Sequence, residues 1–196
     1  MQQNEFEDLK NNPQFMMDLT NKEEEAVKSK DIVGMYEVLD IAVMLDLSAK
    51  RLNRIYTEIL QTVFDRLADK LTKQEFFDIN KKQDLYTMRG IYEHGIERYS
   101  ENDFKGAKEI FLILYYTAND EVLSKAMMPH IVAAASQMKF DDFVDELVDI
   151  DNPNDSETYG FFLTNFKPLV DGFLKEKAEV LNSALKELET LKKGQV

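Results

Sequence analysis

The chain has 196 residues, among them 7 glycines and 4 prolines but no cysteine or tryptophan, and its formal net charge is −13. This length suits one domain, or one domain with a helical extension, and leaves little room for two. The lack of cysteine excludes disulfides, thiolate metal sites and thiol nucleophiles, and the negative charge disfavours nucleic acid and anionic membranes as partners, because both are bound through Lys and Arg.

The sequence shows no targeting or membrane-spanning pattern. Its first residues, MQQNEFED, are polar and acidic, whereas a secretory signal begins with basic residues and continues with an apolar stretch. The longest apolar run, Ile110–Tyr116, is far shorter than the roughly 20 residues that span a bilayer. We therefore expect a cytoplasmic protein without membrane insertion.

Helical periodicity dominates the chain from residue 31 onward. Apolar residues recur at spacings of three and four over 31–43 and again over 52–67, which predicts two helices paired as a hairpin. The run from Thr72 to Glu75 fits a capping box, in which the Thr and Glu side chains each accept a backbone N–H at the start of a helix. It predicts a short helix through Ile79. Residues 1–80 would then form an N-terminal helical region.

Four further helices are predicted in residues 81–150. The apolar pattern places them at about 85–99, 104–114, 122–137 and 140–148. Asp103 is available as the N-cap of the second. Pro129 falls in the third, and we expect it in a first turn or at a kink, because proline cannot donate the backbone hydrogen bond of a helix interior.

The remaining region, 151–196, is predicted to be a linker followed by a long C-terminal helix. The tract 149–156 crowds Asp, Asn, Ser and Pro together, as linkers do. Pro168 suits the first position of a helix that runs from Leu169 to Gly194. Its narrow apolar stripe fits two arrangements, packing back on the preceding helices or forming an intermolecular coil. We expect the three regions to pack as one globular unit.

One stretch has a distinctive spacing of small and aromatic residues. If Met88 is counted as the first position, the eighth, twelfth, seventeenth, twentieth and twenty-fourth positions are Gly95, Tyr99, Phe104, Ala107 and Phe111. This stretch resembles the tetratricopeptide repeat, a helix pair of about 34 residues. Small residues would let its helices approach closely, and aromatic residues would fill the space around them. A weaker second unit begins at Ser124.

The resemblance implies an all-α array of helical hairpins, wound as a right-handed superhelix, with a long C-terminal helix. Within the family, the run GIERYSENDFKGAKEIFLIL is similar to the first repeat of the short acidic chaperones of type III secretion translocator proteins.

In tetratricopeptide folds the first helices of successive repeats line a concave groove. The matching positions imply a partner-binding set here: Arg89, Tyr92, Ile96, Tyr99, Met128 and Val132. Tyrosine and methionine suit an extended or helical peptide, because they offer contact area without demanding one shape. The competing interpretation makes these residues core, covered by the C-terminal helix.

Residues for catalysis or metal binding form no recognised pattern. Neither His94 nor His130 has a second histidine at helical ligand spacing. The acidic tract 141–155 lacks the glycine and glutamate positions of a calcium loop, and no glycine-rich phosphate loop or serine elbow occurs. We therefore expect no catalytic residues, no metal site and no cofactor.

These patterns favour a non-enzymatic scaffold, a chaperone or adaptor that binds another protein. The acidic surface would attract a basic client segment or keep a hydrophobic one in solution. The main alternative is a structural or regulatory homodimer assembled through the terminal helices. A third is a helical enzyme without a recognised signature.

Overall fold

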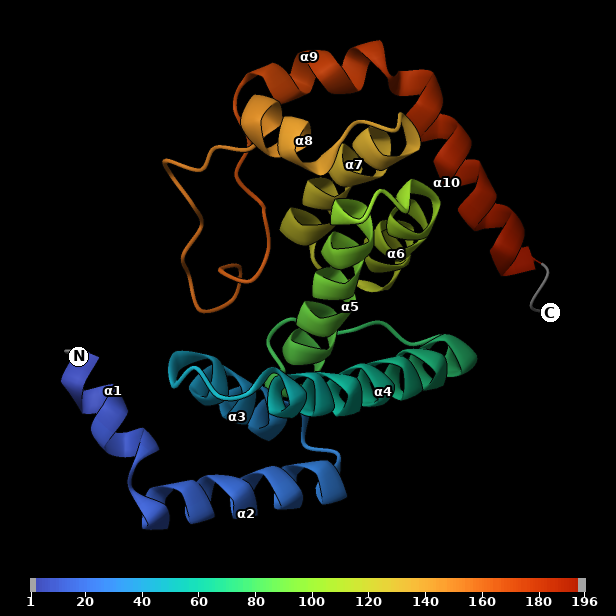
Figure 1. Ribbon diagram of the computed structural model, residues 1–196. Helices are drawn as coiled ribbons and strands as arrows, with labels where there is room; N and C mark the ends of the chain where they lie inside the picture. The colour runs from blue at the N-terminus through green and yellow to red at the C-terminus, as the bar shows by residue number, and fades with distance from the viewer. Residues whose placement is uncertain (1–2, 194–196) are drawn as a thin grey trace. The chain divides into compact units, whose positions relative to one another are not determined.

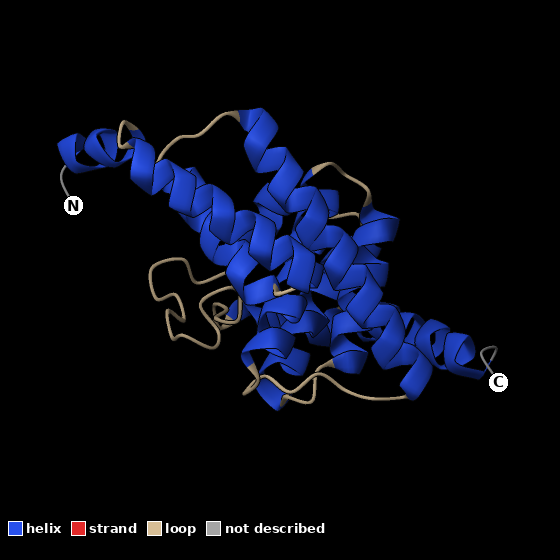
Figure 2. Cartoon of the chain, turned by 90° about the horizontal axis from the view of Figure 1, so that it is seen from below, coloured by secondary structure: helices blue, strands red, loops and turns tan. Residues whose placement is uncertain are grey.

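The computed structural model describes residues 3–193, and their regular structure is helical apart from two isolated β-bridges (Figure 1, Figure 2). The helices are α1 (Gln3–Lys10), α2 (Pro13–Ser29), α3 (Ile32–Met44), α4 (Ala49–Lys73), α5 (Lys82–Ser100), α6 (Phe104–Thr117), α7 (Glu121–Ala135), α8 (Phe140–Leu147), α9 (Leu169–Glu176) and α10 (Ala178–Lys193). The all-α prediction is confirmed for these residues. None of these helices is both long enough and apolar enough to cross a membrane.

The chain divides into two compact units, Met1–Asp69 and Lys70–Val196, where the sequence analysis expects one globular unit. Each is described by itself. The sequence-based boundary at residue 80 falls inside the second unit, so residues 70–80 belong with the helices that follow them.

In the first unit, α2 carries clear signals at both ends. Asn12 Oδ1 accepts the N–H groups of Gln14 and Phe15 at 3.0 and 3.2 Å, and Pro13 opens the helix. Lys30 ends it in a left-handed conformation, with φ 54°. The helices α3 and α4 follow the two predicted apolar stripes. The core of this unit includes Leu19, Ala26, Ile32, Met35, Tyr36, Val38, Ile55, Ile59 and Val63.

The short helix predicted through Ile79 is wrong. The helix α4 continues to Lys73, Gln74 then takes φ 54°, and the following residues form a loop. Phe77 in this loop is fully buried and bridges to the end of α6: its N–H donates to Thr117 O at 2.8 Å, and its carbonyl accepts the N–H of Asn119 at 3.1 Å. Burial of the ring together with two long-range backbone bonds outweighs the local capping preference.

In the second unit, the close pairing of α5 and α6 follows the predicted pattern of small and aromatic residues. A Cβ placed on Gly95 would lie 2.8 Å from Ile110 Cγ2 and 2.9 Å from Phe111 Cε1, so the two helices meet where glycine allows it. Ala107 is fully buried. The Tyr99 ring lies 6.1 Å from Phe104 and 6.2 Å from Phe111, measured between centroids. These residues therefore have the packing roles expected of them.

Two prolines mark the rest of this unit. Pro129 lies inside α7, beyond its first turn, so of its two expected positions the first turn is wrong, and the helix lacks one interior backbone hydrogen bond. Pro168 precedes α9 as its cap residue and does not occupy its first position.

The predicted C-terminal helix is interrupted at Lys177, which separates α9 from α10. The helix α10 packs on α6 and α7, with Ala184 and Leu188 buried and Glu187 paired to Lys108 at 2.5 Å. The α10 part of the predicted stripe therefore packs back on the preceding helices, as in the first of the two expected arrangements, whereas α9 has no buried residue. The predicted end at Gly194 lies outside the described residues.

The approach of α5 and α6 predicts a large effect for Gly95→Ala. The added methyl group would overlap two buried side chains, and we expect a loss of about 1–3 kcal/mol in the free energy of unfolding, measured by urea denaturation. The matched control is Gly172→Ala in α9, where nothing lies within 4 Å of the new Cβ. It should stabilise by up to about 1 kcal/mol, the difference in helix propensity. Equal effects in the two variants would contradict this account.

Candidate functional site

The loop 148–168, between α8 and α9, is closed at its base and is no open linker (Figure 1). Val148 and Phe166 form an antiparallel bridge. On either side of it, the N–H of Asp149 donates to Asn165 O at 3.1 Å and the N–H of Lys167 donates to Leu147 O at 2.8 Å. The two ends of the loop are therefore held together like the ends of a hairpin.

Local turns within the loop explain its polar composition. Asp149 Oδ1 accepts the N–H of Asn152 at 3.3 Å, and Ser156 Oγ accepts the N–H of Tyr159 at 3.0 Å. The Tyr159 hydroxyl donates to Asp120 at 2.9 Å, which ties the loop to the start of α7. The Asn, Asp and Ser residues that predict a linker thus build turns that return the chain to the helices.

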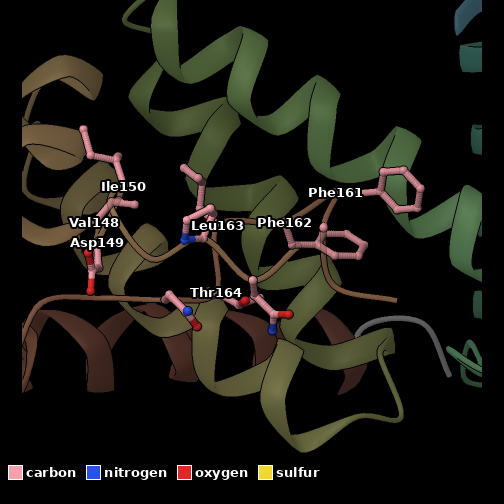
Figure 3. A pocket seen from close by; sticks show the side chains of 11 residues that line it. Val148, Asp149, Ile150, Phe161, Phe162, Leu163 and Thr164 are labelled. Atoms are coloured by element: carbon pink, nitrogen blue, oxygen red, sulfur yellow. The ribbon is translucent and has the colours of Figure 1, made fainter. Parts of the chain in front are cut away.

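The second half of the loop lies on α5 and α7 through aromatic side chains. The ring of Phe161 packs 5.3 Å from Tyr86, and the Arg89 guanidinium lies 4.5 Å from the centroid of the Phe161 ring. Phe162 packs edge-on to Tyr92 at 5.3 Å. Figure 3 shows Phe161, Phe162, Leu163 and Thr164 following one another along this part of the loop. The apolar residues at 161–163 stand inside a polar tract, and this is the sequence signal that could have revealed the contact between the loop and the helices.

A chain of three hydrogen bonds joins the loop to both helices. The N–H of Leu163 donates to Tyr92 Oη at 3.1 Å, Tyr92 Oη lies 3.0 Å from His130 Nε2, and His130 Nδ1 lies 2.8 Å from Ala126 O. Because a carbonyl can only accept, Nδ1 carries the proton of a neutral ring and Nε2 accepts from the tyrosine. All polar atoms of the Tyr92–His130 pair are therefore satisfied.

Burial governs the ionisation of this pair. It lowers the pKa of His130 to about 4, against a weaker opposing effect of the bond to Ala126, because the charged imidazolium would lose its water. Burial likewise raises the pKa of the Tyr92 hydroxyl above its ordinary value, in spite of the hydrogen bond from Leu163. Both groups are neutral at physiological pH, so they support the site as hydrogen-bonding groups.

A pocket of about 220 Å³ opens between the two halves of the loop (Figure 3). Its apolar lining comes from Val148, Ile150, Pro153, Phe161, Phe162 and Leu163. Thr164 also lines it, and the buried Oγ1 of this residue has no hydrogen-bond partner in the described part of the chain. The side chain of Ile150 is 60% exposed. The pocket is large enough for one apolar side chain of a partner.

The structure separates the six predicted partner-binding residues into two groups. Tyr92, Tyr99 and Val132 are buried. Arg89, Ile96 and Met128 are partly exposed. Tyr92 is covered by Phe162 of the loop, and Tyr99 is covered by Phe140 and Phe143 of α8, at 5.4 and 5.9 Å. Tyr92, Tyr99 and Val132 therefore fit the interpretation that these residues belong to the core. The two tyrosines are covered by the loop and by α8, however, and not by the C-terminal helix.

The two buried tyrosines predict opposite responses to loss of the hydroxyl. Tyr92→Phe leaves His130 Nε2 and the Leu163 N–H without partners, and we expect it to lower the free energy of unfolding by about 1–3 kcal/mol. Tyr99 Oη has no hydrogen-bond partner in the described part of the chain. Tyr99→Phe should therefore be neutral or stabilising. Urea denaturation of both variants tests this, and a larger loss from Tyr99→Phe would refute the hydrogen-bond assignment.

His130 predicts a specific loss of stability in mild acid. The unfolded chain binds a proton at this ring below pH 6.5, whereas the folded chain does so only near pH 4. The stability contributed by the neutral ring is complete above pH 6.5 and decreases as the pH falls toward 4. We expect this ring to account for about 2 kcal/mol between pH 7 and pH 5.

The matched variant for this measurement is His130→Gln, which cannot titrate. Urea midpoints at pH 7 and pH 5 should fall further in the wild type than in the variant. Parallel pH profiles would show that His130 does not contribute.

The site offers contact surface and hydrogen bonds more than reactive groups. His94 lies beside Glu97, with Nδ1 3.1 Å from Oε2. Among the residues that the structure describes, no group of three or more histidine, aspartate or glutamate side chains could hold a metal ion. Searches found no match to the chain among protein-family models, curated proteins or solved structures.

Proposed function

We propose that the Lys70–Val196 unit is a non-enzymatic protein-binding scaffold, a chaperone or adaptor that holds an apolar segment of a client on α5 and α7. One observation carries this proposal. The chain's own stretch around Phe161, Phe162 and Leu163 already lies on α5, through ring contacts and one backbone hydrogen bond to Tyr92, whose hydroxyl is bonded in turn to His130 of α7. A surface that holds this segment in cis has the chemistry to hold a similar one in trans.

The contacts of this stretch define the chemistry of the client. Phe161 supplies a ring that stacks on the Arg89 guanidinium, and Phe162 supplies a ring that meets the edge of Tyr92. Leu163 supplies a backbone N–H to the Tyr92 hydroxyl. The client is therefore a segment with two successive aromatic residues, and it would displace the loop from the partly exposed Arg89 side of the surface.

The family-level expectations belong to the same proposal. A tetratricopeptide-like right-handed superhelix would place α5 and α7 on its concave side, as in the type III secretion translocator chaperones that the sequence resembles. We propose a cytoplasmic protein of this kind, whose net charge of −13 favours a basic or hydrophobic client over nucleic acid. The homodimer alternative has less support, because Ala184 and Leu188 of α10 are already buried within their own unit.

The proposal predicts that the loop segment binds when it is supplied as a separate peptide. In the double variant Phe161→Ser/Phe162→Ser, the chain's own loop segment loses both aromatic rings. A fluorescent peptide of residues 158–166, TYGFFLTNF, should bind this variant at least about tenfold more tightly than the wild type, because the cis segment competes at millimolar effective concentration. Fluorescence anisotropy measures both affinities.

The control is the same peptide with serine in place of both phenylalanines, which should not bind. Circular dichroism establishes that the variant is folded. If it is not, the wild type is titrated with excess peptide, and the backbone amide signal of Leu163 is followed by NMR. The proposal would be refuted if the folded variant does not bind the peptide, or if excess peptide does not shift the amide signal of Leu163 in the wild type.

A further inference from the structure

A second, chemically opposite pocket lies in the Met1–Asp69 unit. It has a volume of about 390 Å³ and is lined by Thr20 of α2, by Ser48, and by Lys50, Arg51 and Arg54 of α4. Three cationic side chains and two residues with hydroxyl groups thus make up a lining that contains no carboxylate. In a chain with 37 acidic and 24 basic residues, this local excess of positive charge runs against the overall balance.

A buried carboxylate holds the two arginines in place. Glu23 is 4% exposed, and it accepts from Arg51 Nε at 3.0 Å and from Arg54 Nη2. Arg51 Nη2 also donates to Thr20 Oγ1 at 3.3 Å. One carboxylate neutralises only one of the two guanidiniums, and Lys50 adds a further exposed charge. The pocket therefore keeps a net charge of about +2, on side chains whose orientation is partly fixed.

The position of these cations opposes the stability of α4. Lys50 and Arg51 lie in the first turn of a helix of 25 residues, and that turn contains no acidic residue. The positive end of the helix dipole disfavours cations there by about 0.3–1 kcal/mol each. Burying Glu23 against the arginines adds desolvation that such pairs seldom recover. The first of these costs falls when an anion occupies the pocket, because the anion interacts favourably with the cations and with the helix terminus.

We infer that this pocket binds a phosphate group, either as free inorganic phosphate or as a phosphate monoester. Guanidinium forks match the geometry of phosphate oxygens, and an ammonium group and hydroxyls complete the donors. Arg54 is the residue best placed to reach a ligand, since its side chain is 63% exposed while one nitrogen remains anchored on Glu23. Arg51, whose side chain is 18% exposed, forms the floor together with Thr20.

Isothermal titration of the full-length protein tests this inference at pH 7.5, with sodium chloride holding the ionic strength constant. The probes are inorganic phosphate and O-phosphoserine, titrated separately. We expect saturable binding of one anion per chain. Lys50→Gln/Arg54→Gln should weaken it at least about tenfold, because both changed residues are direct donors. The matched control, Lys28→Gln near the end of α2, removes the same charge outside the pocket and should leave the affinity within about twofold.

The two probes distinguish the source of the phosphate. Tighter binding of inorganic phosphate indicates a free anion, and tighter binding of O-phosphoserine indicates a monoester. If the double variant is not folded by circular dichroism, the single variant Lys50→Gln and NMR shifts of the Ser48–Arg51 amides replace it. No saturable heat with either probe, equal affinity of the pocket variant, or shifts spread evenly over the surface would each overturn the inference.

Discussion

The Lys70–Val196 unit depends on the hydroxyl group of one buried tyrosine. Tyr92 on α5 donates to His130 on α7 and accepts from the backbone of Leu163 in the loop, so a single oxygen joins three parts of the chain. Loss of either partner is costly, since an unpaired buried polar atom costs more than its hydrogen bond contributes. The seating of the loop on the helices depends on this oxygen, and His130 accepts from it as a neutral ring because burial disfavours the charged form.

The sequence predicts this unit well wherever contacts are local. Gly95 and Ala107 lie on successive helices, and their small size is visible in the repeat spacing, so the close approach of α5 and α6 follows directly from the pattern. The cap at Thr72 has an equally good local pattern, yet Phe77 overrides it by bonding to Thr117, forty residues further along. No property of the residues around Thr72 encodes that partner, because the bridge exists only once α6 is in place.

The same distinction explains why the candidate site was only half predictable. Apolar residues at helical spacing on α5 and α7 predict that one face of these helices is covered. The spacing does not identify which segment of the chain, or which partner, covers that face. Tyr92 and Val132 are buried as a core residue would be, and Phe162, which covers Tyr92, comes from a tract whose Asn, Asp and Ser content predicts a linker. In the loop 148–168, residues that form turns are mixed with residues that contact the helices. The turn-forming residues are more conspicuous in a short stretch of sequence, so they favour the linker prediction.

Charge is the feature whose meaning changes most when it is placed on the structure. A net charge of −13 argues against anionic partners for the chain as a whole, but electrostatic recognition acts over about a Debye length, roughly 8–10 Å. The residues that line the pocket on α4 are cationic or neutral, and Glu23 sets one negative charge against their three positive charges. An acidic exterior and a phosphate-binding pocket are therefore compatible. The first disfavours extended polyanions such as nucleic acid, and the second would take a compact anion that can enter between the three cationic side chains.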